Sequence, residues 1–265
     1  MRVAISGGRG FLAQGMIEPL LAAGHVVRLF DVRGGEGPGE TVVGDVAKLD
    51  DARRAVQGCE GLIVAHMAPR SPDAYATPEL SFDINVRGTA NLFFAAREAG
   101  IRRAVLISST ATIQNYPRPW RHDLPGDRPA GIYGLTKACQ EVIAKFAADS
   151  YGMAVAALRI GYVVDGDAMR DKYGRAVSER NEMDCDRRDV GEVARRWLEG
   201  DFAGFETFQV MSTREAMDSC ALRYTCERLG WEPRYDFDRL PLPDPEKAAQ
   251  RRAGRAAGKS QGAST

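Results

Sequence analysis

Arg2–Ala13 reads RVAISGGRGFLA, and this stretch decides the fold of the chain. Its first residues, Arg2–Ser6, are mostly apolar and predict a short buried strand, and the residues after the glycines, up to Ala23, predict an amphipathic helix. Gly7 permits a tight turn between the two, and Gly10 lets the backbone approach a ligand at the helix N-terminus. Strand, turn and helix together predict a pyrophosphate cradle; the alternative is an ordinary connection between a strand and a helix.

An acidic residue ends the next predicted strand, Val26–Asp31. Asp31 follows the glycine turn by about twenty residues, where a carboxylate accepts hydrogen bonds from the ribose diol of a dinucleotide. Because a carboxylate at this position repels a 2′-phosphate, Asp31 favours NAD over NADP. Arg9 in the turn and Arg33 just after the strand are able to pair with a 2′-phosphate, which keeps NADP as the alternative cofactor.

Strands and helices continue to alternate over residues 1–164. Further strands are predicted at Thr41–Gly44, Gly61–Ala65, Arg103–Ile107 and Val155–Gly161, with helices at Leu49–Gln57, Pro78–Ala99 and Tyr133–Tyr151. This alternation predicts an α/β fold with a Rossmann-like, doubly wound parallel sheet. We therefore expect residues 1–164 to form an NAD-binding domain that also carries the catalytic residues.

The alternation weakens after Val164, and 166–186 is polar without a clear period. We expect residues 165–243 to form a small C-terminal substrate-binding lobe. Residues 244–265 are dominated by Ala, Arg, Lys, Gly and Ser and predict a disordered basic tail, with a basic anchor as the alternative. The elements predicted in the lobe are a helix through Leu198 that starts at a capping box, Asp189–Glu192, a strand at Thr207–Met211 and a helix at Arg214–Leu229.

The composition limits the classes of partner. The chain has 265 residues, 44% of them hydrophobic, and its 36 basic residues balance 36 acidic ones. This favours one globular unit with a full core and gives no argument for a nucleic-acid or membrane partner. Met1 and Arg2 run directly into Val3–Ile5 without a signal-peptide pattern, so we expect a cytoplasmic protein. The five scattered cysteines, without CxxC spacing, favour free thiols over a metal site or disulfides.

Tyr133 and Lys137 form the candidate catalytic pair. Residues four apart on a helix share one face, so the two side chains are expected side by side. An ammonium beside a phenol lowers the tyrosine pKa and yields a base that takes a proton from an alcohol while a hydride leaves the same carbon. This spacing also arises by chance on solvated helices. Here, however, Ser108, Ser109 and Thr110 end the strand just upstream, at the edge where parallel sheets bind ligands.

Other polar residues near these motifs have structural explanations as well as functional ones. Asp45 either caps the helix that follows it or contacts the adenine amino group of a nucleotide. Asn85, in an apolar helix, is explained more simply as a polar core residue than as part of a proton path. The long loop Asn115–Gly131 is expected to line the site, and His122 within it is expected at the surface rather than as the base.

The ordered set of motifs resembles the extended short-chain dehydrogenase/reductase family, the NAD-dependent epimerase/dehydratase group, from Arg2 to about Leu242. The motifs that carry the resemblance are Ser6–Ala13, Asp31, Asp45–Val46, Ala65–Ala68, Asn85–Thr89, Ser108–Thr110, Tyr133 with Lys137, and Leu158–Gly161.

The resemblance implies a role for each matched residue. Tyr133 is then the general base, and Lys137 lowers its pKa and holds the nicotinamide ribose. Ser109 or Thr110 hydrogen-bonds the reacting oxygen. The residues implied to contact NAD are Gly7, Gly10, Phe11, Leu12, Asp31, Arg33, Asp45, Val46, Ala65, Met67, Asn85, Ser108, Tyr133, Lys137 and Ile160.

The chain departs from the family pattern at informative positions. Ala13 replaces the last glycine of the turn, and Thr110 replaces the usual serine, so a hydroxyl is retained. Dehydratases of the family carry an Asp-Glu pair directly after this hydroxyl; Ala111 and Thr112 stand here instead, so dehydration is not expected. Nucleotide-sugar epimerases hold the nucleotide with a substantial C-terminal lobe, and the short lobe expected here favours a small, free substrate.

Among the short members of the family, the chain is most similar to bacterial uronate dehydrogenases, which oxidise the anomeric carbon of glucuronate or galacturonate to an aldarolactone with NAD. The similarity lies in Ser108–Pro117, Tyr133–Glu141, Ala157–Gly161 and Leu229–Pro233. It implies that Arg170 holds a substrate carboxylate as a bidentate pair, and that Ser109, Thr110 and Ala111 line the substrate site. Those enzymes have a substrate-touching Asn-His pair where Thr110 and Ala111 stand, so another aldose, polyol or hydroxy acid also fits.

Three functions follow from this pattern. The first is an NAD-dependent dehydrogenase that acts on a small sugar or sugar acid, with Tyr133 as its base. The second is a sugar epimerase that keeps its NAD bound, and the third is a non-catalytic NAD-sensing protein of the same fold. By resemblance we also expect a homodimer formed through Glu79–Ala99 and Tyr133–Tyr151.

Overall fold

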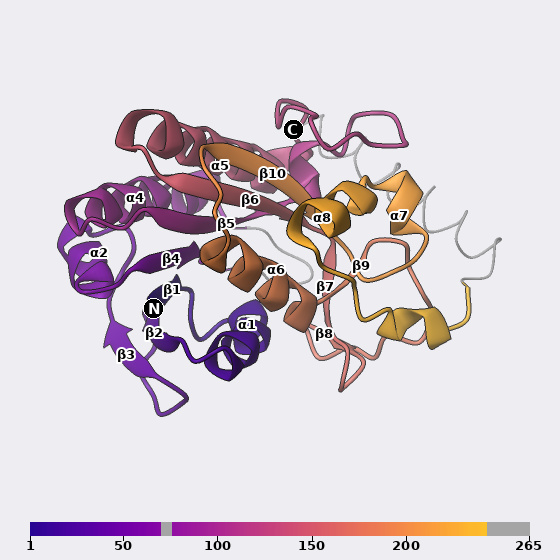
Figure 1. The fold of residues 1–265 in the computed structure, drawn as a ribbon, viewed down its shortest axis with the longest axis horizontal. Coiled ribbons are helices and arrows are strands. Elements are labelled where there is room, and N and C mark those ends of the chain that lie inside the picture. The colour runs from indigo at the N-terminus through magenta and orange to yellow at the C-terminus, as the bar shows by residue number, and fades with distance from the viewer. Residues whose placement is uncertain (70–75, 243–265) are drawn as a thin grey trace.

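The computed structural model describes residues 1–69 and 76–242 of the 265-residue chain. The basic tail expected at 244–265 lies outside the described residues. A seven-stranded sheet has the order β10-β6-β5-β4-β1-β2-β3, and every neighbouring pair in it is parallel (Figure 1). Its strands are β1 (Arg2–Ser6), β2 (Val26–Asp31), β3 (Glu40–Val43), β4 (Gly61–Val64), β5 (Arg103–Ser109), β6 (Ala154–Ile160) and β10 (Phe205–Val210). The α/β, Rossmann-like fold expected from the sequence is confirmed.

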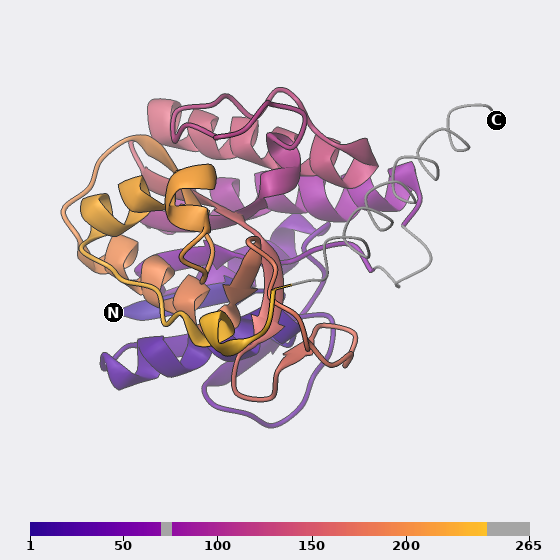
Figure 2. The ribbon, with the colours of Figure 1, turned by 90° about the vertical axis from the view of Figure 1, so that its right-hand side faces the viewer.

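Helices cover both faces of this sheet (Figures 1 and 2). On one face α1 (Phe11–Ala22) packs against α6 (Arg187–Glu199), and on the other α4 (Gly88–Glu98) packs against α2 (Leu49–Val56) and α5 (Gly131–Tyr151). Alternate strand residues supply the two cores: Val3 and Ile5 belong to the core under α1 and α6, and Ala4 and Leu62 to the core under α2 and α4.

The helix predicted from Pro78 to Ala99 contains a π-helical turn. The chain runs through α3 (Pro78–Ser81), a π turn at Phe82–Arg87 and α4 without a break. Thr77 caps the start through its side chain, which accepts a hydrogen bond from Leu80 N, and Pro78 occupies the first turn. Such π turns are frequent at functional sites, and this one contains Asn85.

The C-terminal part corrects three sequence expectations. The strand at Thr207–Met211 and the helix through Leu198 were expected within the small lobe at 165–243, yet β10 extends the main sheet beside β6, and α6 belongs to its helical layer. The physical reason is that β6, α6 and β10 form one more parallel strand–helix–strand unit. The polar insertion 166–186 hides this unit in the sequence.

The helix boundaries in this part also differ from those predicted. The cap of α6 is Asp186, whose side chain accepts from Arg188 N, because the helix begins before the predicted box; Asp189 lies inside it and is buried. The helix predicted at Arg214–Leu229 is two helices, α7 (Ala216–Ser219) and α8 (Leu222–Leu229). Ala221, with a φ of 55°, separates them.

A small sheet stands at the carboxyl end of β6. It has the order β8-β7-β9 and consists of β7 (Tyr162–Asp165), β8 (Arg170–Asp171) and β9 (Asp184–Asp186). Since β7 follows β6 after a single residue, this sheet lies at the edge of the main sheet where the parallel strands end. Within residues 1–69 and 76–242, every helix is too short or too polar to cross a bilayer.

Candidate active site

The glycine turn after β1 has the geometry of a phosphate cradle. Gly7 adopts a φ of +67°, and a Cβ on it would lie 2.7 Å from the Cα of His66, so only glycine fits there. Gly10 donates a hydrogen bond to Gly7 O at 2.8 Å and is the N-cap residue of α1. Because glycine has no capping side chain, the first amides of α1 face outward as donors for phosphate oxygens. The turn therefore fits a dinucleotide pyrophosphate.

Asp31 is held in place at the end of β2. Its Oδ2 accepts from Arg9 N at 3.0 Å, and its Oδ1 accepts from Arg33 N at 3.0 Å and from Arg33 Nε at 3.3 Å. The Arg9 guanidinium donates to Thr41 Oγ1 at 2.8 Å and to carbonyl oxygens of the loop before β3. These hydrogen bonds hold the Arg9 side chain against that loop. This arrangement presents a carboxylate where a ribose diol is expected, and Arg33 remains the exposed cation beside it.

Asp45 and Val46 shape the wall next to the glycine turn. Asp45 Oδ1 accepts from Ala47 N at 2.9 Å, and this closes a turn ahead of α2. The N-cap residue of α2 is Lys48, so Asp45 does not cap that helix directly. Val46 is buried, and a Cβ on Gly88 would lie 2.6 Å from its Cγ2, so α4 approaches this turn closely.

His66, for which the sequence indicated no role, connects the glycine turn to the π turn. Its Nδ1 lies 2.9 Å from Ser6 Oγ and its Nε2 lies 3.0 Å from Ile84 O. Burial lowers the pKa of His66 to about 3, and the Lys137 charge adds to this, so the ring is neutral. Because a carbonyl only accepts, Nε2 carries the proton and Nδ1 accepts from Ser6. The signal in the sequence was a histidine directly after a fully apolar strand.

Asn85 connects the segment after β4 to α5. Its Oδ1 accepts from Ala68 N at 2.8 Å, and its Nδ2 donates to Thr136 Oγ1 at 2.9 Å. Thr136 in turn donates to Tyr133 O at 3.0 Å. The structure therefore gives Asn85 the role of a buried polar link, and through Thr136 this link fixes the helical turn that carries Tyr133.

The first turn of α5 rests against the turn that follows β5. Ala130 N donates to Ala111 O at 2.9 Å, and a Cβ on Gly134 would lie 2.8 Å from that same oxygen. The absence of a side chain at Gly134 thus lets the helix approach the Thr110–Thr112 turn. Because Tyr133 precedes this glycine, it lies at the carboxyl end of β5.

Lys137 lies one helical turn further along α5 and is buried. Its Nζ donates to Ile107 O at 2.7 Å. Burial lowers the pKa of Lys137 to about 7; the charge of Glu141 opposes this shift, and the charge of Lys172 adds to it. The contribution of Lys172 places the residues just after β8 within electrostatic reach of Lys137.

The three hydroxyls at the end of β5 have different partners. Ser108 Oγ donates to Glu141 Oε1 at 2.5 Å, so this side chain belongs to the buried network beneath α5. Ser109 Oγ accepts from Ala111 N at 3.1 Å, and Thr110 Oγ1 donates to Ile160 O at 3.4 Å. Since Ser108 and Ser109 alternate along a strand, they face opposite sides of the sheet.

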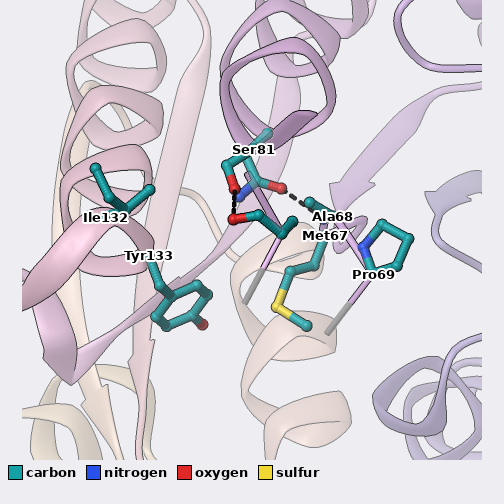
Figure 3. A pocket seen from close by; sticks show the side chains of 8 residues that line it. Met67, Ala68, Pro69, Ser81, Ile132 and Tyr133 are labelled. Atoms are coloured by element: carbon teal, nitrogen blue, oxygen red, sulfur yellow. Dashed lines mark hydrogen bonds between the residues drawn. The ribbon is translucent and has the colours of Figure 1, made fainter. Parts of the chain in front are cut away.

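A small pocket, open to solvent, lies at the start of α5. Figure 3 shows the Tyr133 ring and the Met67 side chain facing one another across it. The lining is mostly apolar and consists of Met67, Ala68, Pro69, Ala76, Ser81, Asn85, Ile132 and Tyr133. The structure thus brings the predicted base and two predicted cofactor contacts, Met67 and Asn85, to one cavity.

Arg170 and His122 lie away from this pocket lining. Arg170 is exposed on β8, and its Nη1 donates to Gly174 O at 2.6 Å. The same hairpin carries Lys172. The ring of His122 stacks on Tyr224 with 3.9 Å between the centroids, a packing contact between the loop after β5 and α8. Among residues 1–69 and 76–242, no cluster of His, Cys, Asp and Glu is arranged to bind a metal.

Comparison with known proteins finds sugar and sugar-acid dehydrogenases among the relatives of this chain. The chain is similar to an L-arabinose 1-dehydrogenase (NAD(P)⁺) of Haloferax volcanii, at 31% identity over 67% of this chain and 73% of that protein. It is 34% identical to a uronate dehydrogenase of Agrobacterium fabrum over 60% of each chain.

Solved structures share the fold. A uronate dehydrogenase from Agrobacterium tumefaciens superposes with a TM-score of 0.73 at 24% identity and covers 92% of this chain and 91% of its own. A short-chain dehydrogenase/reductase superfamily protein with bound NAD, also from Agrobacterium tumefaciens, has a TM-score of 0.75 at 24% identity and covers 98% of this chain and all of its own. The model of the NAD dependent epimerase/dehydratase family matches residues 3–172, and the chain therefore belongs to that family.

Proposed function

We propose that this protein is an NAD-dependent dehydrogenase that oxidises a hydroxyl of a small, free sugar or sugar acid. The observation that carries the proposal is the arrangement of Tyr133 and Lys137 on α5. Lys137 is fixed on Ile107 O, and Tyr133 opens into a pocket at the carboxyl edge of the sheet. The glycine turn and Asp31 support NAD as the cofactor.

In this proposal the residues of α5 and β5 move the proton. Tyr133 takes the proton of the substrate hydroxyl, and the Lys137 ammonium favours the phenolate that this requires. Ser109 or Thr110 orients the reacting oxygen. When bound, the nicotinamide accepts the hydride that leaves the same carbon. Gly7 and Gly10 hold the pyrophosphate, and Asp31 holds the adenosine ribose.

The substrate class rests on the relatives and on the small sheet. Two relatives of this chain are named as dehydrogenases of L-arabinose and of uronates, both free sugars or sugar acids. Arg170 is exposed on β8, and a guanidinium there is suited to pair with a substrate carboxylate. We propose that Arg170 is the carboxylate anchor and that the small sheet is the substrate-binding part of the protein.

The experiment that tests this proposal measures NADH formation with NAD or NADP and a panel of uronates, pentoses, hexoses, polyols and hydroxy acids. Turnover with a uronate, lost in Arg170→Ala, would support both the reaction and the anchor. Turnover with neutral sugars alone would keep the reaction and remove the anchor. If no substrate gives net NADH and the purified protein carries NAD that does not dissociate, the epimerase becomes the better explanation.

We further propose a homodimer formed through the α4–α5 side of the molecule. Four side chains of α5 leave large apolar surfaces open to solvent on that side: Ile132, Leu135, Val142 and Phe146, with exposed fractions of 40%, 39%, 69% and 53%. A second copy that buries such a stripe accounts for it.

A further inference from the structure

A row of buried polar side chains crosses three strands beneath α5. Ser108 on β5, Arg159 on β6 and Gln209 on β10 are register partners, and their exposed fractions are 0%, 1% and 0%. Register partners in a parallel sheet point to the same face. Burying a polar side chain in the centre of a sheet costs free energy unless it forms hydrogen bonds. Packing alone therefore does not explain this row.

Glu141 on α5 is the acceptor for two members of this row, Ser108 and Arg159. Its carboxylate accepts from Arg159 Nε at 2.9 Å and Nη2 at 2.7 Å, from Ser108 Oγ at 2.5 Å and from Thr112 Oγ1 at 3.4 Å. The side chains of Arg159 and Glu141 are 1% and 7% exposed. The paired geometry and the two hydroxyls satisfy the carboxylate that burial has stripped of water.

The same pair holds the loop that lies between β5 and α5. Arg159 Nη1 donates to Leu124 O at 2.7 Å, and a Cβ on Gly126 would overlap Glu141 Oε2. Through one ion pair, α5 is therefore joined to the end of β5, to the turn that follows it, to β6 and to the loop.

We propose that Glu141 is a positioning residue for Tyr133 and Lys137, a role that rests on the proposed function. Glu141 lies one helical turn beyond Lys137 and two beyond Tyr133 on the same side of α5. Its contacts to Ser108 and Thr112 fix how far α5 extends along β5. They thereby set the position of the base relative to the hydroxyls of Ser109 and Thr110.

Glu141 also acts through its charge. Among the described residues, the charged groups that act on Lys137 are Glu141 on α5 itself and Lys172 after β8. The Lys137 charge in turn acts on His66 after β4, Arg159 lies beyond Glu141, and Tyr133 stands one helical turn before Lys137. Among the charged ones, Glu141 alone is negative. Removal of the negative charge of Glu141 therefore makes proton loss easier for the pair formed by Tyr133 and Lys137. This holds whichever of the two residues releases its proton first, because the two titrations are coupled.

Two variants separate position from charge. Glu141→Gln keeps the shape of the side chain and loses its charge, and Glu141→Asp keeps the charge but withdraws the carboxylate by one methylene. In both we expect kcat to fall by roughly 10- to 100-fold, since a small displacement of the base suffices for this. The affinity for NAD should change far less, because the cradle lies on β1 and α1. Circular dichroism checks that each variant is folded.

The deciding measurement is the titration of Tyr133 itself. Near-ultraviolet absorbance follows its phenolate, and the same variant with Tyr133→Phe provides the baseline that removes the other tyrosines. We expect the titration to move to lower pH in Glu141→Gln and to stay in place in Glu141→Asp. A merely structural role would leave both titrations in place. This measurement needs no substrate, so it still tests the inference if the wild-type protein turns over nothing in the panel.

Two outcomes would overturn the inference: an unmoved Tyr133 titration in Glu141→Gln, or an unchanged kcat in Glu141→Asp. If Glu141→Gln does not fold, Glu141→Asp decides alone. The inference then requires a fall in kcat with the NAD affinity kept, and any other result for that variant rejects it.

Discussion

At the scale of single residues, the site combines a half-buried phenol with a deeply buried ammonium. Lys137 donates to Ile107 O, and burial moves its pKa from the usual range of a lysine to about 7. A lysine in this state responds strongly to neighbouring charge, so small changes around Lys137 should alter the base that we propose it supports.

Replacement of the base tests the mechanism directly. In Tyr133→Phe the proton acceptor is lost while the ring remains, so we expect turnover to fall by roughly 10²- to 10⁴-fold. NAD affinity should be retained, since the glycine turn and Asp31 are untouched. Steady-state NADH formation and a binding titration with NAD measure the two effects, and a variant that keeps wild-type turnover would exclude Tyr133 as the base.

Asp184 on β9 is a buried carboxyl whose charge opposes folding. It is 4% exposed, its Oδ2 accepts from Asn181 N at 2.8 Å, and burial raises its pKa to about 7. A carboxyl whose pKa is raised in the folded state binds more protons there than in the unfolded chain. The free energy of unfolding therefore falls as pH rises from about 4 to about 7, and the full penalty is present above that range.

Asp184→Asn removes this titration. Between pH 4 and pH 7 the variant should become more stable than the wild type by roughly 2 to 4 kcal/mol of unfolding free energy. Above pH 7 this difference should stay constant. Urea unfolding at pH 4, 5, 6, 7 and 8 measures it. A pH-independent difference would mean that Asp184 titrates alike in the folded and unfolded chains.

Residue types and spacing were enough to predict that Tyr133 and Lys137 lie on one helix and that a tight glycine turn follows the first strand, because these geometries are local. Residues that act through distant partners were not predictable in this way. His66 pairs with Ser6 and Glu141 pairs with Arg159 only because the sheet brings separate strands and helices together. Nothing in the local sequence distinguishes Glu141 from a solvated helical glutamate.

At the scale of elements, α5 has one buried side and one exposed apolar side. Lys137, Gln140, Glu141 and Ala144 face the sheet and α4, whereas Val142 and Phe146 are 69% and 53% exposed. One face of the helix therefore carries the proposed Lys137 and Glu141 positions, and the other face is available to a second molecule. Helical periodicity predicts this division, but the exposed side became evident only once the sheet and α4 were placed.

Val142→Glu tests the proposed dimer. A charge in the centre of the apolar stripe would be buried without a partner in a dimer, so we expect the variant to be monomeric with its fold intact. Sedimentation velocity at several protein concentrations measures the mass. Leu21→Glu is the control, because Leu21 on α1 is also exposed, at 40%, but lies on the opposite layer. Equal masses for wild type and Val142→Glu would remove this helix face as the interface.

At the scale of the whole molecule, the order of strands and helices through β6 followed from the sequence, and the last strand did not. The glycine turn and the alternation over residues 1–164 give the first six strands. β10 was assigned to a lobe because the insertion 166–186 separates it from β6, and a strand's pairing partner depends on contacts that the local sequence does not encode.

Cofactor binding should stabilise the whole domain, since the glycine turn, Asp31 and α5 come from separate parts of the sheet. NAD at a free concentration 100 times its dissociation constant should raise the unfolding free energy by about 2.7 kcal/mol. Thermal unfolding with increasing NAD measures the effect, with NADP at equal concentration as the comparison. A larger stabilisation by NADP would show that Arg33, rather than Asp31, determines cofactor choice.

The position of β10 at the edge of the sheet has a consequence for biosynthesis. β6 is buried along its whole length, and β10 supplies the hydrogen bonds on its outer side. A ribosome adding about 5–20 residues per second leaves that side open for several seconds between the synthesis of β6 and that of β10. During this interval the nascent chain presents an unpaired apolar strand, the kind of edge that recruits chaperones or pairs with another nascent chain. A premature stop codon between Ile160 and Phe205 would make this state permanent.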